Sequence, residues 1–320
     1  MSDGLLVAGG LVALVMGAEV LVRAGTSLAS WLGIRPMMIG LTVVSLGTSV
    51  PELAIGIDAA LGGSPGLAVG NVVGTNLVNL LLILGLSAAL VPIALDRATL
   101  RFDLPAMTAA ALLLYLLAID GTLTRLDGSI LLFGALAYTA GLVQVSRRET
   151  ADPAEDPAVN VAAAADRHRP LRQVLLLLVA LAVVVIGAEL LVDGAVSSAR
   201  SLGVSDTIIG LTIVAVGTSA PELVTTVVST LRGERDLAIG NLIGSSIYNI
   251  AAVLALTTLV APHGIPVPDE VLAADLLLLV VATAATVPVF LSGNRITRIE
   301  GGLFVASYIG YLTWLLLTRT

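Results

Sequence analysis

The sequence predicts an all-α integral membrane protein with ten transmembrane helices in two inverted five-helix repeats and with broken helices at the membrane midplane. Three observations support this fold class. The 320 residues are 57% hydrophobic and 12% charged, whereas soluble domains contain about 25% charged residues. Ten apolar stretches are long enough to cross a bilayer. The two halves of the chain also repeat one another.

The ten stretches are rich in Leu, Val and Ala, which suits contact with lipid. They are predicted at 4–22, 36–61, 67–91, 103–119, 128–146, 172–192, 206–231, 237–261, 270–291 and 299–317. The first stretch follows "MSDGLL", which lacks the basic region of a signal peptide. We therefore expect it to be a retained helix.

One polar stretch, 147–171, separates the two halves. Its Pro, Ala and charged residues predict a flexible linker rather than a folded domain. The expected organisation is a first five-helix repeat at 1–146, a linker at 147–171 and a second, inverted repeat at 172–320.

The arginines predict the orientation in the membrane. All 16 basic residues are Arg, and basic residues favour cytoplasmic loops. With the N-terminus outside, 13 of them lie in the cytoplasm and only Arg125, Arg200 and Arg319 lie outside. We therefore expect both termini outside and the linker in the cytoplasm.

Residues 16–92 align with 186–262 at a constant offset of 170, with 31 identities and no gap. Five helices per half is an odd number, so the second half must enter the membrane in the opposite direction. Inverted repeats are typical of transporters, whose sites lie where broken helices meet. A duplication kept only for packing would explain the repeated Gly and Leu, but not the repeated Glu and Asn.

The most informative repeated motif is "GTSVPEL" at 47–53, which returns as "GTSAPEL" at 217–223. It places Glu52 and Glu222 deep in apolar stretches, and the one basic residue within a predicted span, Arg172, is the first residue of its span. Such a carboxylate is either protonated or neutralised by a bound cation. Pro51 and Gly47 loosen the helix, so we expect backbone carbonyls around 46–49 to face a cavity.

The available ligands indicate which cation suits the site. Carbonyls, hydroxyls and carboxylates are hard oxygen ligands, which suit Ca²⁺ and also Na⁺. The chain has no Cys, and its two His residues, His168 and His263, lie in predicted loops. A softer metal such as Zn²⁺ is therefore disfavoured.

A second repeated motif supplies neutral ligands. "GNVVGTNLVN" at 70–79 matches "GNLIGSSIYN" at 240–249. Asn79 and Asn249 lie four residues after Thr75 and Ser245, on the same helix face. Two carboxylates neutralise one Ca²⁺, and neutral amides and hydroxyls complete a shell without adding charge.

At these motifs the sequence resembles the cation/Ca²⁺ antiporter superfamily, and its prokaryotic sodium/calcium exchanger branch in particular. The resemblance extends over nearly the whole chain. It implies electrogenic exchange of about three Na⁺ for one Ca²⁺ by alternating access in a prokaryotic plasma (inner) membrane, with no prosthetic group. It also implies that the helices around Gly17 and Gly187 are the pair that slides across the core.

The resemblance also implies a role for each motif residue. Glu52 and Glu222 would bind Ca²⁺ and Na⁺, and the carbonyls of Thr48 and Thr218 would complete the Ca²⁺ shell. Na⁺ ligands would come from further side chains and from two backbone carbonyls. These are Ser49, Ser219, Thr75, Ser245, Asn79 and Asn249, with the carbonyls of Ser45 and Ala215.

One departure affects the choice of counter-ion. Some archaeal and K⁺-dependent relatives have Asp where this chain has Asn249, which weakens the case for K⁺ coupling. A count of two carboxylates also permits H⁺, so an H⁺-driven antiporter of Ca²⁺ or another divalent cation is the alternative.

Other classes of function are disfavoured. An intramembrane enzyme would need an acid and a base in unlike environments, and the repeat makes the two Glu environments alike. A channel would not need matched broken helices. The sequence has no basic-aromatic surface for nucleic acid and gives no sign of an obligate protein partner, so the expected partners are the lipid bilayer and the transported ions.

Three further acidic residues each have two possible roles. Asp58 faces away from Glu52 on the same helix, and is either on an ion access path or simply at the outer helix end. Glu19 and Glu189 recur in both halves, and are either gating residues or interfacial residues. Glu19 has Arg23 four residues later, at the spacing of a helical ion pair.

Overall fold

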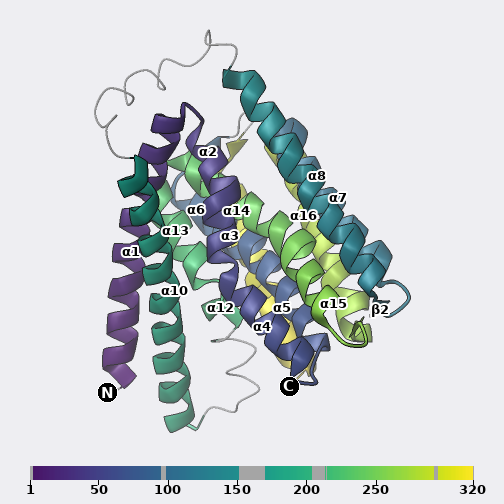
Figure 1. The fold of residues 1–320 in the computed structure, drawn as a ribbon. Helices are drawn as coiled ribbons and strands as arrows, with labels where there is room; N and C mark the ends of the chain where they lie inside the picture. The colour runs from purple at the N-terminus through teal and green to yellow at the C-terminus, as the bar shows by residue number, and fades with distance from the viewer. Residues whose placement is uncertain are drawn as a thin grey trace.

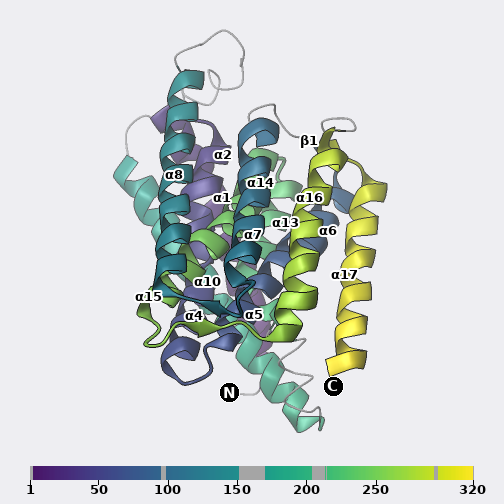
Figure 2. The same ribbon diagram turned by 90° about the vertical axis from the view of Figure 1, so that its right-hand side faces the viewer.

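The computed structural model describes residues 3–94, 99–150, 170–203, 213, 215–291 and 295–319. Within these ranges the chain is nearly all helical, and the helices stand side by side as a bundle (Figures 1 and 2). The described chain begins and ends at the same end of the bundle (Figure 1). Helix α8 (Arg125–Thr150) ends, and α10 (Pro170–Ser201) begins, at the opposite end.

Nine helical segments in the described part of the chain are long and apolar enough to cross a membrane. They are Asp3–Leu32, Pro36–Leu61, Gly66–Leu90, Thr99–Ala118, Arg125–Val145, Pro170–Ser201, Arg235–Val260, Val271–Pro288 and Arg298–Thr318. Each coincides with a predicted stretch. The remaining prediction, at 206–231, falls partly outside the described residues.

The elements of the first half are α1 (Asp3–Leu32), α2 (Pro36–Ile39), η1 (Gly40–Val44), α3 (Ser45–Thr48), α4 (Val50–Leu61), α5 (Gly66–Leu77), η2 (Val78–Ile83), α6 (Leu84–Leu90), β1 (Ile93–Ala94), η3 (Thr99–Asp103), α7 (Leu104–Ala118), β2 (Thr122–Leu123) and α8. Here η denotes a π-helical segment. Those of the second half are α10, α12 (Ala215–Gly217), α13 (Ala220–Leu231), α14 (Arg235–Tyr248), η5 (Asn249–Leu254), α15 (Ala255–Val260), β3 (Ile265–Pro266), η6 (Val271–Leu276), α16 (Leu277–Leu291), β4 (Arg295–Ile296) and α17 (Arg298–Arg319). The predicted linker, 147–171, lies outside the described residues except at its two ends, which are helical.

Helices α1 and α10 are about ten residues longer than the stretches predicted at 4–22 and 172–192. The predictions were too short because hydropathy marks only the apolar part of a helix, while the hydrogen-bonded backbone continues through small polar residues. The helices stop at Gly33 (φ 67°) and Gly203 (φ 79°). This left-handed conformation is available to Gly without steric cost and ends a helix.

The pair α1 and α10 lies along one edge of the bundle (Figure 1), and glycines bring the two backbones into contact. A Cβ on Gly10 would come within 2.7 Å of the Gly187 carbonyl oxygen, and one on Gly187 within 2.8 Å of the Leu14 nitrogen. Small residues are typical of such close helix pairs in membranes.

Two small sheets depart from the all-α prediction. β1 pairs antiparallel with β4, and β2 pairs antiparallel with β3. Each strand has two residues, which is too short to leave an alternating pattern in the sequence. Each sheet joins a loop of the first half to a loop of the second, β1–β4 at the end of the bundle opposite the termini (Figure 2).

The interior has one large apolar core and two smaller ones. The large core lies among α5–α8 and α14–α17, and the smaller cores join α1 and α10 to the rest of the bundle. Many large apolar side chains remain exposed on the outside, including Leu116, Phe133 and Leu178. An exposed apolar surface of this kind suits a protein surrounded by lipid.

Candidate ion-binding site

The first repeated motif breaks its helix at Ser49. Helix α3 ends at Thr48, Ser49 has φ −85° and ψ 4°, and α4 starts at Val50. Pro51 in the first turn of α4 has no N–H to offer the Gly47 carbonyl. Fewer backbone carbonyls leave the helical ladder than predicted. The carbonyls of Ser45 and Ser49 each keep their hydrogen bond to the N–H four residues later, at 3.1 Å.

The second motif breaks its helix at the equivalent position. Helix α12 ends at Gly217, and α13 begins at Ala220 with Pro221 in its first turn. Ser219 has φ −88° and ψ 8°, close to the values at Ser49. The same residues therefore produce the same local backbone in both halves.

The side chains of the residues predicted to supply ligands are almost fully buried. Ten of them are at most 2% exposed: Ser45, Thr48, Ser49, Glu52, Thr75, Asn79, Ser219, Glu222, Ser245 and Asn249. Thr218 is partly exposed. Ala215 begins α12, and its side chain lies outside the described part of the structure.

Most of these buried polar groups have no hydrogen-bond partner among the described residues. This holds for both carboxylate oxygens of Glu52 and Glu222, and for both amide atoms of Asn79 and Asn249. It also holds for the hydroxyls of Ser49, Thr75 and Ser219. Buried polar groups in proteins nearly always have partners, because leaving them unpaired costs free energy. A concentration of unpaired oxygens therefore points to a ligand that supplies the missing interactions.

Contacts between the halves bring the two motifs together. The Thr48 hydroxyl lies 3.4 Å from that of Ser245, which donates to the Ser45 carbonyl at 3.4 Å. Glu52 on α4 and Glu222 on α13 each lie three residues after the break in their half. The site is thus shared between α3, α4, α13 and α14.

Glycines allow this approach of α3 to α14. A Cβ on Gly244 would lie 2.7 Å from the Leu41 carbonyl oxygen and 2.7 Å from the Ser45 hydroxyl. A Cβ on Gly240 would lie 2.5 Å from the Met37 carbonyl oxygen. The Gly residues of the second motif therefore allow backbone contact across the site.

Two π-helical segments, not predicted from sequence, adjoin the amide ligands. Asn79 lies in η2, and Asn249 begins η5. A π-helical turn inserts an extra residue into the helical ladder and is frequent at functional sites. Its appearance after both "GN" motifs gives the two amides similar backbone settings.

Asn241 is a further site residue that the ligand prediction omitted. Its amide oxygen accepts a hydrogen bond from Thr48 at 3.3 Å, and its amide nitrogen donates to Thr225 at 3.0 Å and Thr226 at 3.2 Å. The recurrence of Asn at 71 and 241 was the signal that could have identified it.

Among the described residues, no three His, Cys, Asp or Glu side chains group together as for a metal cluster. A cation at Glu52 and Glu222 would therefore draw its other ligands from neutral hydroxyls, amides and carbonyls. That ligand set suits hard cations such as Ca²⁺ and Na⁺.

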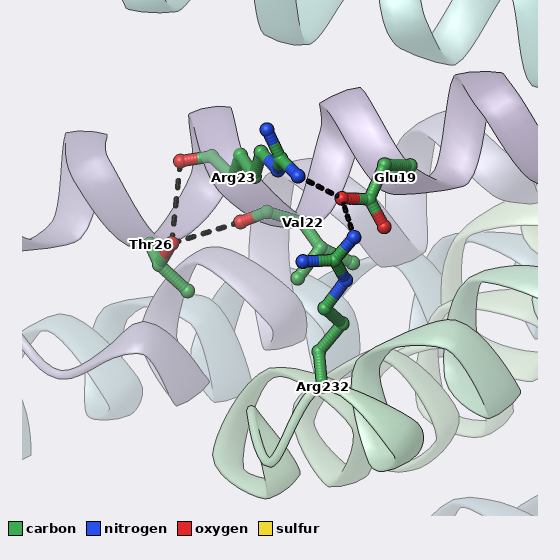
Figure 3. A network of polar contacts seen from close by, with 5 residues as sticks. All are labelled: Glu19, Val22, Arg23, Thr26 and Arg232. Atoms are coloured by element: carbon green, nitrogen blue, oxygen red, sulfur yellow. Dashed lines mark hydrogen bonds and ion pairs between the residues drawn. The ribbon is translucent and has the colours of Figure 1, made fainter.

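The three further acids have different environments. The predicted Glu19–Arg23 ion pair is confirmed at 2.7 Å, and Glu19 also pairs with Arg232 at the end of α13 (Figure 3). Glu189 and Asp58 are exposed. Among the described residues, the inter-helix ion pair is therefore seen at Glu19 and not at Glu189.

Comparison with known proteins identifies the family. The family model described as sodium/calcium exchanger protein matches residues 3–144 and 172–317. The chain belongs to this family. The match includes both motifs and leaves out the stretch between the two halves.

Named relatives agree with the assignment. One relative is the candidate antiporter CaxA of Alkalimonas amylolytica. The two sequences are 39% identical over 308 residues, and the alignment covers 94% of this chain and 95% of the relative. The chain is 31% identical over 336 residues to the sodium/calcium exchanger MaX1 of Methanosarcina acetivorans, covering 95% of each.

The fold also matches a solved structure. The sodium/calcium exchanger from Methanococcus jannaschii superposes with a TM-score of 0.83 at 29% sequence identity, over 97% of each chain. The family, the relatives and the fold together identify an integral membrane cation/Ca²⁺ exchanger. The resemblance stated from the motifs is therefore confirmed.

Proposed function

We propose that the protein exchanges Na⁺ for Ca²⁺ by alternating access, with about three Na⁺ per Ca²⁺ and without K⁺. The observation that supports this most directly is the pair of fully buried carboxylates, Glu52 and Glu222, surrounded by unpaired oxygens. A buried charge of this kind is costly unless a cation compensates it. Ca²⁺ carries the charge that two carboxylates neutralise.

In this proposal each predicted ligand keeps its role. Glu52 and Glu222 bind both ions, and the carbonyls of Thr48 and Thr218 complete the Ca²⁺ shell. The side chains of Ser49, Ser219, Thr75, Ser245, Asn79 and Asn249, with the carbonyls of Ser45 and Ala215, serve Na⁺. The burial of most of these side chains supports this assignment, as do the unpaired carboxylate and amide atoms of Glu52, Glu222, Asn79 and Asn249.

Asn249 bears on the counter-ion. Its neutral amide leaves two carboxylates in the site, so bound Ca²⁺ leaves no negative charge for K⁺. Three Na⁺ would give the site a net charge of +1. Two carboxylates can also bind two protons, so H⁺-driven Ca²⁺ export is the alternative function. The transport assay below distinguishes it from Na⁺-driven exchange.

We infer two inverted five-helix repeats, with both termini outside the cell and 147–171 in the cytoplasm of a prokaryote. The shared position of the two chain ends supports an even number of spans (Figure 1). The equivalent breaks at Ser49 and Ser219 support the repeat. The excess of Arg at the end opposite the termini supports the orientation.

The test is transport by proteoliposomes loaded with Na⁺. Removal of external Na⁺ should drive uptake of ⁴⁵Ca²⁺, and external K⁺ should have no effect when the membrane potential is held at zero. Glu52→Gln and Glu222→Gln should each abolish uptake. Asp58→Asn, an exposed acid on the same helix as Glu52, should retain it.

Two outcomes would contradict the proposal. Uptake driven by a pH gradient alone would replace Na⁺ with H⁺ as the counter-ion. Uptake that survives in either Glu variant would remove the carboxylates from the ion site.

A further inference from the structure

Helix α13 carries a polar face that extends from the ion site to the end of the helix. Thr225, Thr226, Ser229 and Thr230 follow Glu222 by three, four, seven and eight residues, which places all of them on its side of the helix. They are at most 3% exposed. At 1.5 Å per residue the hydroxyls cover about 12 Å beyond Glu222, and the helix ends at Leu231.

The apolar residues of α13 lie on the other side. Val224 and Val228 pack against the small cores formed with α1 and α10. The hydroxyl face is instead turned toward α14, where Asn241 bonds to Thr225 and Thr226. The polar groups are therefore directed into the protein interior rather than toward lipid.

These groups are not all satisfied by their own helix. Thr225 and Ser229 donate to backbone carbonyls four residues earlier, at 2.6 and 2.7 Å, which is common for hydroxyls in membrane helices. The buried Thr230 hydroxyl has no partner among the described residues. The Asn241 amide is turned toward the site, since it accepts from Thr48.

The first half has no equivalent polar face. At the positions offset by 170 stand Ile55, Gly56, Ala59 and Ala60. A Cβ on Gly56 would lie 2.7 Å from the Thr257 hydroxyl, so α4 is packed tightly against α15 there. The two halves therefore have equivalent ligand motifs, but only α13 of the second half continues from its Glu as a polar face.

Two ion pairs lie near the end of α13 that this polar face reaches. Arg232, directly after α13, pairs with Glu19 of α1 (Figure 3). Arg35, before α2, pairs with Asp236 of α14 at 3.2 Å. Both pairs are partly exposed, and such pairs contribute little to stability. They can therefore open at small cost.

We propose that the hydroxyl face of α13, with Asn241, lines the route by which cations pass between Glu222 and the membrane side at which α13 ends. Asn241, Thr225 and Thr226 form a transient site on this route for Na⁺ or Ca²⁺, bound through neutral oxygens. Neutral ligands hold a cation weakly enough to release it. The inference rests on the proposed function, since it assumes that the ion site is the one described above.

Thiol accessibility tests the route directly, because the chain has no cysteine and each substitution adds the only thiol. Ser229→Cys and Thr230→Cys should react with a membrane-impermeant cationic methanethiosulfonate applied at the α13-end side. The matched controls Val224→Cys and Val228→Cys lie on the apolar side of the same helix. We expect reaction at least about tenfold faster at 229 and 230 than at the controls, because opening of the proposed route admits water and the reagent to the hydroxyl face, whereas Val224 and Val228 stay packed against the cores formed with α1 and α10.

The dependence of the labelling rate on bound ions is a second test of the route. Reaction at 229 and 230 should change in rate between Ca²⁺ alone, Na⁺ alone and neither, as alternate access opens and closes this end. Reaction no faster than at 224 and 228 under every ion condition, or only from the opposite side, would overturn the route.

A pair of substitutions tests the transient site without a thiol. Thr226→Val should slow ⁴⁵Ca²⁺ exchange about fivefold, the equivalent of one lost hydrogen-bonding group, while Thr226→Ser should restore it. Stabilisation of the folded protein by Ca²⁺ should persist in both, because the carboxylates are intact. Equal rates in the Val and Ser variants would remove Thr226 from the route.

The two proposals can fail separately. Na⁺-driven ⁴⁵Ca²⁺ uptake without labelling at 229 and 230 would leave the exchange intact and overturn the route. Ion-dependent labelling in a protein that does not exchange Na⁺ for Ca²⁺ would keep the route and overturn the proposed ions.

Discussion

Glu52 and Glu222 are the residues on which the proposed chemistry depends. Each is fully buried, and neither has a hydrogen-bond partner among the described residues. The ion pairs seen at Arg23, Arg35 and Arg232 are made with other acids, namely Glu19 and Asp236. A mobile cation is therefore the simplest source of compensating charge.

Ca²⁺ should stabilise the folded protein through these two residues. A ligand at 100 times its Kd stabilises the state that binds it by about 2.7 kcal/mol, so the melting temperature of the detergent-solubilised protein should rise with Ca²⁺. Glu52→Gln and Glu222→Gln should lose this rise, while the exposed Glu189→Gln should keep it. A full Ca²⁺ shift in either site variant would contradict the assignment.

Asn249 should determine whether a third charge can enter the site. Asn249→Asp adds a carboxylate, so bound Ca²⁺ leaves one negative charge that a monovalent cation can neutralise. We expect ⁴⁵Ca²⁺ uptake by this variant to be stimulated by K⁺ at zero membrane potential, whereas the original chain is unaffected. Asn249→Ala removes the amide without adding charge and should lower uptake with no response to K⁺. A K⁺ response in the Ala variant would show that charge is not the cause.

At the scale of elements, the broken helices shape the candidate site. The backbone leaves the helix at Ser49 because Pro51 removes an N–H from the ladder. Gly47 has a second use, since a Cβ there would lie 2.7 Å from Leu181 of α10. One motif therefore both interrupts a helix and sets its distance from a neighbour.

Pro51→Ala should restore the missing N–H and draw the Gly47 carbonyl back into the helix. A ligand displaced by about 1 Å can cost about 100-fold in a well-formed site, so we expect the Ca²⁺ concentration for half-maximal uptake to rise by at least about tenfold. Pro105→Ala, at a helix start away from the site, is the matched control. Unchanged Ca²⁺ dependence at position 51 would show that the break does not shape the site.

The contact between α3 and α14 depends on Gly244. A Cβ there would lie 2.7 Å from both a backbone carbonyl and the Ser45 hydroxyl, and such overpacking costs about 1–3 kcal/mol. Gly244→Ala should therefore lower the melting temperature and reduce transport. Gly302→Ala, in α17 where no described atom lies within 4 Å of the new Cβ, should instead be neutral or stabilising by up to about 1 kcal/mol. Equal melting temperatures in the two variants would contradict the close approach of α3 and α14.

At the scale of the whole molecule, the two halves meet around one site. Residues of the first half contact residues of the second through α3 and α14, through α1 and α10, and through both small sheets. These contacts couple the two halves of the candidate site, as the proposed alternating access requires.

The exchange ratio can be read from the whole transport cycle. Three Na⁺ leaving for each Ca²⁺ entering removes one positive charge from the vesicle interior. An interior-positive potential, set with valinomycin and K⁺, should therefore accelerate ⁴⁵Ca²⁺ uptake, and an interior-negative potential should slow it. Equal K⁺ on both sides is the control. Uptake that does not respond to potential would indicate an electroneutral ratio instead.

Much of this organisation was predictable because the membrane restricts what a chain can do. Nine predicted stretches coincide with long apolar helices in the described residues, since only helices or closed barrels can satisfy a backbone in lipid. The Gly–Thr–Ser and Pro–Glu motifs identified the breaks at Ser49 and Ser219, because Pro acts on its own helix. These are local effects, and local effects are recorded in short stretches of sequence.

Other features depend on partners distant in the chain. Helices α1 and α10 extend past their apolar stretches. The hydrogen bond from Thr48 to Asn241 joins residues 193 positions apart. The two-residue strands and the π-helical turns at Asn79 and Asn249 leave no periodic signal. Prediction fails at such points because a contact between segments has no signature within either one.

The sequence by itself determined the membrane class, the helical segments, the duplicated motifs and the two acids of the proposed site. The apolar composition shows that the chain is surrounded by lipid, and Gly, Pro and Glu affect the backbone and the charge at their own positions. Only the tertiary structure decided that the hydroxyls of α13 form an interior polar face with Asn241, and that Glu19 pairs with Arg232. These depend on which helix packs against which, because the free energy of a polar group in a membrane is set by its neighbours.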